Sequence, residues 1–277
     1  MSRPPQEEIA KLIALYTAGD FQQLLEEARR CQRDYSVSPI LHNLTGAAYA
    51  GVKDYKTAIE HYRKAIKTDP SYMQAYNNIA TAYYAITDHA NAIKHFRRAI
   101  ELNPDFADAY SNMSLVHLAS ENLIEAKTCI DKALSLDSTK ASYFNNLAVI
   151  FQREENWTYA AQNFQKALEI DPSSAETHSN YGNALAQLGQ TKDAMASYQK
   201  AIQINPHLHS THYNMGNLFT TLGDEVQAQN AFCHAIDYRQ EDGLKAEART
   251  AAATHASDAP PSLAIYFRSL ARARKFE

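Results

Sequence analysis

The sequence contains little cysteine, little glycine and no long apolar run. Among its 277 residues there are three cysteines and eight glycines. No stretch reaches the roughly 18 consecutive apolar residues that a transmembrane helix requires. The N-terminal stretch MSRPPQEEIAKLIALY has no basic segment followed by an apolar core, so no signal peptide is expected. These absences predict a cytoplasmic protein.

The three cysteines, Cys31, Cys129 and Cys233, lie far apart in the chain. Their odd number and their wide separation argue against a disulfide framework. Free cysteine behaves as a small apolar residue and is frequently buried. We therefore expect three reduced, buried thiols.

The formal net charge of the chain is −4. This balance does not create the strongly positive field that attracts nucleic acid, so no nucleic-acid partner is expected. The sequence also lacks the phosphate-binding motif GxxxxGK(S/T), and no Ser-His-Asp or Cys-His grouping stands out. We expect a protein that is not an enzyme and that carries no cofactor.

One asparagine recurs every 34 residues along most of the chain. The series consists of Asn78, Asn112, Asn146, Asn180 and Asn214. Two alanine series keep the same step, one from Ala58 to Ala228 and the other from Ala65 to Ala235. A fixed period of this length is typical of a protein built from stacked copies of one supersecondary unit.

The period divides the chain into seven copies of a 34-residue unit. Residues 1–4 form an arm, residues 5–38 form an atypical first copy that acts as a cap, and residues 243–277 form a tail. Copies two to seven are residues 39–72, 73–106, 107–140, 141–174, 175–208 and 209–242. Apolar residues at helical spacing on both sides of a central turn predict an all-α protein made of helix-turn-helix units.

Small and aromatic residues recur at matching positions of the copies. Small residues on the expected first helices are Gly46, Ala80, Ser114, Ala148, Gly182 and Gly216. Aromatic residues on the expected second helices are Tyr62, Phe96, Phe164, Tyr198 and Phe232. Helices that cross closely need small side chains at the crossing, so we expect the aromatic rings to fill the space beside the small residues.

These residues carry the pattern of a known family. The sequence resembles the tetratricopeptide repeat proteins, whose copies have an aromatic, a Leu-Gly pair, Tyr, Ala, Phe and Pro at fixed offsets. Copy three has Tyr76, Ile79-Ala80, Tyr83, Ala92, Phe96 and Pro104. The match spans residues 5–242. The resemblance implies a right-handed superhelical solenoid with an inner groove lined by first helices.

The asparagine series is similar to one in the repeat region of O-linked N-acetylglucosamine transferases, where the asparagines hold an extended peptide by its backbone. An Asn amide can donate to and accept from a peptide unit. The resemblance therefore implies a peptide-binding groove formed by Asn77, Asn78, Asn112, Asn145, Asn146, Asn180, Asn183, Tyr213, Asn214 and Asn217. The alternative is that the asparagines bond to neighbouring backbone or helix ends and only stiffen the stack.

The expected groove carries little charge. Asp108, Arg153 and Glu176 are the charged residues expected on its surface. A tetratricopeptide clamp for the acidic C-termini of chaperones needs paired cations on successive copies, so such a clamp is not expected. The groove should instead prefer a neutral to mildly basic protein or peptide segment.

Four histidines raise the question of a metal site. His207, His209 and His212 are clustered, and His178 lies one copy earlier. His178 and His212 occupy the aromatic packing position of the repeat, so packing is expected and a metal site is not.

Two interpretations of the tail remain open. Residues 243–277 could form capping helices that cover the apolar face of copy seven. Alternatively, residues 262–277 could form a basic amphipathic helix, with Arg268, Arg272, Arg274 and Lys275, that contacts a partner or an anionic membrane. A short helix with so few cations binds membranes weakly, which favours the cap.

The first functional hypothesis is a non-enzymatic scaffold that binds an extended peptide or protein segment. The alternative is the substrate-recognition arm of a transferase, either a sulfotransferase or a glycosyltransferase, with the catalytic domain absent from this chain. The GDF turn followed by ILHNLTGAAYAG resembles the start of bacterial sulfotransferases with such repeats. A homo-oligomeric scaffold is a further alternative.

Overall fold

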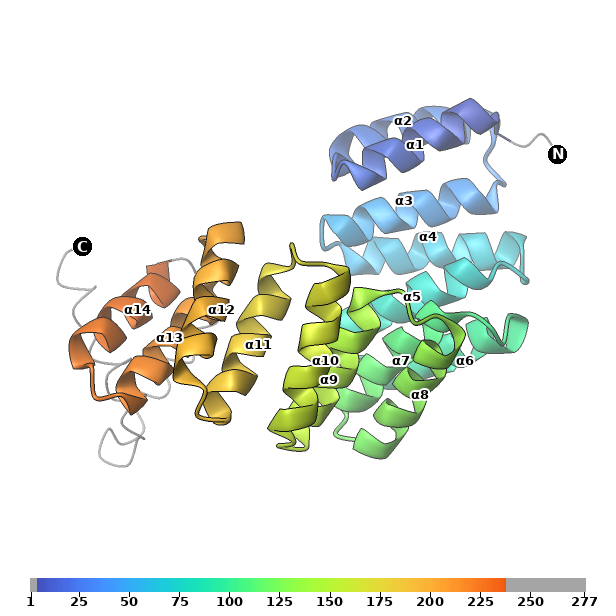
Figure 1. The fold of residues 1–277 in the computed structure, drawn as a ribbon. Coiled ribbons are helices and arrows are strands. Elements are labelled where there is room, and N and C mark those ends of the chain that lie inside the picture. Colours follow the sequence, from blue (N-terminus) through green and yellow to red (C-terminus); the bar gives the residue numbers. More distant parts are fainter. Residues whose placement is uncertain (1–3, 238–277) are drawn as a thin grey trace, which may run out of the picture. The chain divides into compact units, whose positions relative to one another are not determined.

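The computed structural model describes residues 4–237 and contains fourteen α-helices and no strand within them. The first helices of the seven copies are α1 Gln6–Thr17, α3 Pro39–Gly51, α5 Met73–Ala85, α7 Ala107–Ala119, α9 Ala141–Arg153, α11 Ala175–Gln187 and α13 His209–Thr221. The second helices are α2 Phe21–Asp34, α4 Tyr55–Thr68, α6 His89–Leu102, α8 Leu123–Leu136, α10 Trp157–Ile170, α12 Thr191–Ile204 and α14 Glu225–Asp237. The expected all-α repeat fold is confirmed (Figure 1).

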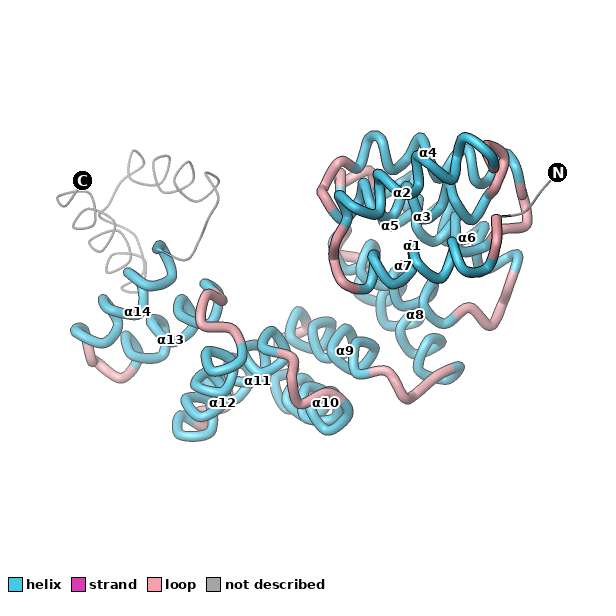
Figure 2. The backbone as a smooth tube through the Cα atoms, turned by 90° about the horizontal axis from the view of Figure 1, so that it is seen from above, coloured by secondary structure: helices cyan, strands magenta, loops and turns pink. Residues whose placement is uncertain are grey.

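The chain divides into two compact units, which we call unit 1 (residues 1–138) and unit 2 (residues 139–277). In each unit a first helix packs on the second helix of its own copy, and that second helix packs on the first helix of the next copy. Consecutive first helices also contact each other, as in α3 with α5 and α11 with α13. Figure 2 shows these helix pairs and the short loops that join them.

The small residues lie where the two helices of a copy cross, as expected. A Cβ atom added to Gly46 would lie 2.7 Å from the Tyr62 ring, and one added to Gly182 would lie 2.7 Å from the Tyr198 ring. Gly216 has the same relation to Phe232. Tyr62, Tyr198 and Phe232 are almost completely buried. Any larger side chain at these glycines would displace a core ring, which explains the recurrent small residue.

The turn inside each copy contains one residue in the left-handed backbone region. Glycine occupies this position in three copies, at Gly19, Gly189 and Gly223. The other four copies place a side chain there, at Lys53, Thr87, Glu121 and Glu155, with φ between 56° and 64°. Because L-residues with a Cβ disfavour this region, these four turns are strained relative to the glycine turns.

Aspartates begin several second helices. The side chains of Asp20, Asp54 and Asp88 each accept a hydrogen bond of 3.1 Å from a backbone N–H in the first helical turn. Asp224 does the same before α14. These N-caps satisfy donors that the start of a helix leaves free.

The predicted tail, residues 243–277, lies outside the described residues. The proposed partner-binding or membrane-binding helix at residues 262–277 therefore stays a prediction, as does the cap. Most of the predicted arm, residues 1–4, and the end of copy seven also lie outside the described range of 4–237.

Candidate functional site: asparagines of the first helices

The first helices after α1 carry very little charge. α3, α5 and α13 contain no Asp, Glu, Lys or Arg. Asp108 on α7, Arg153 on α9 and Glu176 on α11 are the charged residues of the other three. We call the side chains of α3, α5 and α7 that reach solvent the first-helix face of unit 1, and those of α9, α11 and α13 the first-helix face of unit 2. Both faces are polar but almost uncharged.

All ten predicted site residues lie on these helices, and all ten side chains are half-buried. They are Asn77 and Asn78 on α5, Asn112 on α7, Asn145 and Asn146 on α9, Asn180 and Asn183 on α11, and Tyr213, Asn214 and Asn217 on α13. Asn146 has an interaction partner within the molecule. The Tyr213 ring packs against Phe232, with 5.6 Å between ring centroids, and so contributes to the core of copy seven.

In unit 1 the asparagines hydrogen-bond to one another from copy to copy. The amide nitrogen of Asn78 donates to Oδ1 of Asn43 at 3.0 Å, and that of Asn112 donates to Oδ1 of Asn77 at 3.1 Å. Within copy three, the amide nitrogen of Asn77 donates to Oδ1 of Asn78 at 3.3 Å. Four amides therefore form one chain across α3, α5 and α7. Each such bond contributes about 0.5–1.5 kcal/mol to stability.

Two hydrogen bonds between copies of unit 2 are longer. The amide nitrogen of Asn214 lies 3.5 Å from Oγ of Ser179, and Oγ1 of Thr177 lies 3.4 Å from Oδ1 of Asn145. Both distances lie at the long end of the range for hydrogen bonds. Each of these two bonds is weaker than an amide–amide bond of unit 1.

Three other amides of unit 2 have unused hydrogen-bonding groups. Among residues 4–237, the side chains of Asn180 and Asn183 make no hydrogen bond. The Oδ1 atom of Asn217 is buried and has no hydrogen-bond partner there. Buried polar atoms are normally paired, so an unpaired one is an exception that needs an explanation. Unit 2 thus retains amide groups that a ligand could use.

Sequence reasoning missed the acceptors that the ladder asparagines use. Each donor lies 35 residues after its acceptor, in the pairs Asn78 with Asn43, Asn112 with Asn77, and Asn214 with Ser179. Asn43 is buried, at 8% exposure, and was not among the predicted site residues. Polar residues separated by one repeat plus one residue were the signal that could have revealed this pairing.

Histidines at the aromatic position of the repeat form hydrogen bonds to the loop that precedes their helix. A ring nitrogen of His42, His178 and His212 lies about 3 Å from the carbonyl oxygen six residues earlier, namely that of Ser36, Pro172 or Pro206. Burial lowers the pKa of His42 and of His212. Within the described residues, no three His, Cys, Asp or Glu side chains converge as metal ligands would.

The cysteines partly match the expectation of burial. Cys31 and Cys129 are buried, whereas Cys233 is only half-buried. Burial raises the pKa of the Cys129 thiol to about 11. A thiol with so high a pKa is a poor nucleophile at neutral pH.

The stacked helix pairs, the small residues at their crossings and the 34-residue period define a tetratricopeptide repeat protein. A model of the family described as the cilia and flagella-associated protein 70 C-terminal domain matches residues 17–205, more than half of the chain. The chain belongs to this family of tetratricopeptide repeats. Proteins of this kind are generally non-catalytic scaffolds that bind protein or peptide partners.

Solved structures share the fold at low sequence identity. A chain of the APC/C hetero-tetramer Cut9–Hcn1 has a TM-score of 0.77 and 16% identity, covering 94% of this chain and 48% of that one. A tetratricopeptide repeat protein from Parabacteroides merdae has a TM-score of 0.67 and 16% identity, covering 87% and 96%. YrrB, described as having an unusual peptide-binding site, has a TM-score of 0.50 and 23% identity, covering 69% and 99%.

The chain thus spans about half the length of the APC/C chain that it matches. No curated protein matches the sequence. Among residues 4–237, no helix combines the length and apolar character needed to cross a membrane.

Proposed function

We propose that this chain is a non-enzymatic scaffold that binds an extended, neutral to mildly basic segment of a partner protein on its first helices. The observation that carries the proposal is the pair of half-buried amides, Asn180 and Asn183, that make no hydrogen bond among the described residues. They lie three residues apart on α11, so both are on one side of that helix. Each offers two N–H donors and one carbonyl acceptor to a peptide backbone.

The low charge of α11 and α13 favours a ligand that is recognised through its peptide backbone. α13 has no formally charged Asp, Glu, Lys or Arg, and α11 has only Glu176. A strongly charged ligand would find no paired partner on these two helices, whereas peptide N–H and carbonyl groups would find amides. Glu176 adds a mild preference for a basic residue in the bound segment.

Asn217 extends the same argument to copy seven. Its Oδ1 atom is buried and has no hydrogen-bond partner within residues 4–237, and the ordinary cost of such an atom is about 1–3 kcal/mol. A ligand N–H that reached this amide after a small side-chain rotation would remove part of that cost. The face of unit 2 from α11 to α13 is therefore the centre of the proposed site.

A paired pull-down from a lysate of the source cells tests the proposal. One bait is the wild-type chain and the other carries Asn180→Ala, Asn183→Ala and Asn217→Ala. A third bait with Gln187→Ala and Thr221→Ala, two exposed residues of α11 and α13, controls for unspecific loss. We expect partners retained by the wild type and the control, and lost from the triple variant at an equal melting temperature. Equal recovery by all three baits would reject the site.

A further inference from the structure

Three consecutive second helices of unit 1 carry an arginine at the same repeat position. The residues are Arg29 on α2, Arg63 on α4 and Arg97 on α6, and all three are exposed. We call them the arginine column. The next four copies place Asp131, Gln165, Gln199 and Cys233 at this position. The column is therefore specific to the first three copies and is not a general feature of the repeat.

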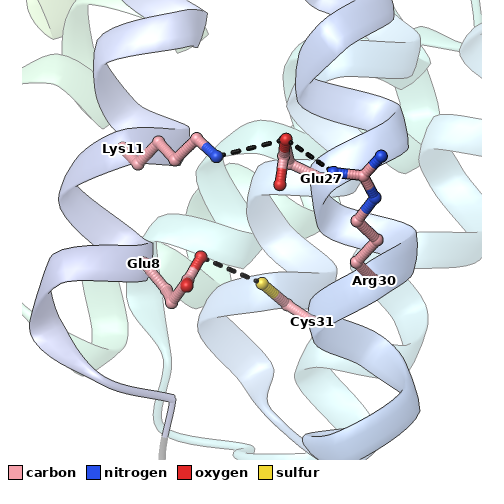
Figure 3. Close-up of polar contacts among 5 residues, drawn as sticks. All are labelled: Glu8, Lys11, Glu27, Arg30 and Cys31. Atoms are coloured by element: carbon pink, nitrogen blue, oxygen red, sulfur yellow. Dashed lines mark hydrogen bonds and ion pairs between the residues drawn. The ribbon is translucent and has the colours of Figure 1, made fainter.

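The residue after each arginine is also a cation, but two of these three are neutralised. Arg30 forms an ion pair with Glu27 at 3.1 Å, and Glu27 also forms an ion pair with Lys11 on α1 at 3.1 Å (Figure 3). Arg98 pairs with Glu101 at 2.9 Å. Because two of these three cations are paired with glutamates, the second set contributes less net positive charge. The guanidinium groups of the arginine column form no such ion pair among the described residues and are the ones free to bind an anion.

Tyrosine hydroxyls of the next copy hold two of the three arginines. A guanidinium nitrogen of Arg63 donates to the Tyr83 hydroxyl at 2.6 Å, and one of Arg29 donates to the Tyr49 hydroxyl at 3.5 Å. A hydroxyl is neutral, so it orients the guanidinium without cancelling its charge. Guanidinium groups that are already oriented lose less entropy when they bind a carboxylate.

The tyrosines are themselves held in place. The Tyr83 ring stacks on His95 with 5.2 Å between centroids, and the Tyr49 ring stacks on His61 with 5.5 Å. The same Arg, Tyr and His arrangement thus occurs twice in succession. At the third step His117 replaces the tyrosine, and Arg97 is left without that hydroxyl partner.

The balance of charge is positive on α4 and α6, although the whole chain carries −4; α2, with three Arg, two Glu and one Asp, is formally balanced. α4 contains four Lys or Arg residues and one Glu, and α6 contains three and one. Lys64, Lys67 and Lys94 are exposed beside the column. The first helices that pack on α4, namely α3 and α5, contain no Asp, Glu, Lys or Arg. The positive charge of unit 1 is therefore concentrated on α4 and α6.

We propose that the arginine column is a second interaction surface, which binds an acidic, carboxylate-rich segment of a partner protein. Guanidinium groups bind carboxylates through two parallel hydrogen bonds, and such charge-assisted bonds are the strong ones at protein surfaces. Glu26 and Glu60 lie one turn before Arg29 and Arg63. They disfavour the unbroken negative charge of a nucleic-acid backbone but tolerate carboxylates spaced along a peptide. This surface is on second helices and is independent of the first-helix site.

Fluorescence anisotropy with a labelled oligoglutamate peptide tests the proposal on the full chain. An oligoglutamine peptide of equal length is the uncharged probe. We expect oligoglutamate alone to bind, with affinity falling as salt is raised. The variant Arg29→Gln, Arg63→Gln, Arg97→Gln should bind it roughly tenfold more weakly or worse. The matched control is Lys132→Gln, Lys166→Gln, Lys200→Gln, which removes the same charge from later copies.

Three results would overturn the proposal. These are an equal loss of binding in both triple variants, no binding of oligoglutamate by the wild type, or tighter binding of a single-stranded oligonucleotide that displaces the peptide. Because Arg63 and Arg29 contact the next copy, the triple variant could also fold less stably. The single variant Arg97→Gln, compared with Lys132→Gln, avoids that effect because Arg97 has no tyrosine partner. Its affinity for oligoglutamate should fall while that of Lys132→Gln stays unchanged.

Discussion

The amides of α3, α5 and α7 bond to one another in an unbroken chain, whereas on α11 two amides have no hydrogen-bond partner among the described residues. The ladder position is asparagine in both units, yet the neighbours differ. In unit 1 the preceding copy supplies Asn43 and Asn77, and in unit 2 it supplies Ser179 as the acceptor for Asn214. A shorter side chain reaches less far, so the bond is longer and weaker.

The comparison separates two roles that one repeated residue can have. In unit 1 the ladder asparagines bond to amides of the preceding copy and so stiffen the stack. On α11 the ladder asparagine Asn180 makes no hydrogen bond among the described residues, although the preceding copy supplies an amide, Asn145, whose Oδ1 atom accepts from Thr177 instead. The bonds of unit 1 agree with a structural role of the ladder, and the binding of a ligand by unit 2 stays a proposal.

The largest expected effect concerns the cores of the two units. Phe96 on α6 and Phe164 on α10 occupy the same repeat position and are fully buried. Phe96→Ala and Phe164→Ala should each lower the free energy of unfolding by about 3–5 kcal/mol, because each leaves a large cavity. Hydrogen exchange followed by mass spectrometry should show the loss of protection mainly in the unit that carries the change. Equal loss in both units would mean that they unfold together and would weaken the comparison.

Acid should destabilise unit 1 through His61. Burial, with help from the charges of Lys64 and His42, lowers the pKa of His61 from 6.5 to about 4. Between those pH values the unfolded chain binds more protons, so the free energy of unfolding falls as the pH decreases. The full shift corresponds to about 3 kcal/mol, and solvent screening of the partly exposed ring reduces the loss to about 2 kcal/mol, which is complete below pH 4. Urea unfolding of the wild type and of His61→Gln across this range should show a flatter profile for the variant; parallel profiles would exclude His61 as the cause.

Loss of one ladder asparagine should cost stability in unit 1 and little in unit 2. Asn78→Ala leaves the buried Oδ1 of Asn43 without a donor, which costs about 1–2 kcal/mol. Asn180→Ala removes no hydrogen bond among the described residues, and alanine favours a helix, so its effect should stay within about 0.5 kcal/mol. Urea unfolding of both variants measures the difference. A similar cost at both positions would show that the ladder has one structural role throughout.

The smallest effect is expected at the turns. Lys53 has φ 64° and Gly189 has φ 74°, at the same repeat position. Lys53→Gly should raise stability by about 0.5–1 kcal/mol because glycine enters the left-handed region without strain, and Gly189→Ala should lower it by a similar amount. Thermal unfolding monitored by circular dichroism resolves such shifts. Opposite signs at the two positions are the expected result, and a loss of stability in Lys53→Gly would contradict it.

Much of the fold follows from the sequence period. First helices of copies two to seven begin at Pro39, Met73, Ala107, Ala141, Ala175 and His209, the residues at which these copies were expected to begin. The glycines that face Tyr62, Tyr198 and Phe232 were also expected, because only a small residue allows so close a crossing. A period defines which residues share a position, and the packing of helix pairs follows from it.

The period does not define which side chains meet between copies. The link from Asn78 to Asn43 spans 35 residues, because a residue of one first helix faces the position one residue earlier in the preceding copy. The 34-residue period alone does not contain that shift. The division into two units was not expected either, since the 34-residue spacing continues across residue 138 without an insertion. Cys233, predicted to be buried, is half-buried.

Hydrogen–deuterium exchange of the full chain, with and without a partner recovered in the pull-down, tests the central claim most directly. The account predicts slower exchange in α11 and α13 when the partner is bound, with α3 and α5 unchanged. The variant with Asn180→Ala, Asn183→Ala and Asn217→Ala should lose this protection. Protection that is confined to second helices, or that is equal over the first helices of both units, would contradict the assignment of the binding site to unit 2.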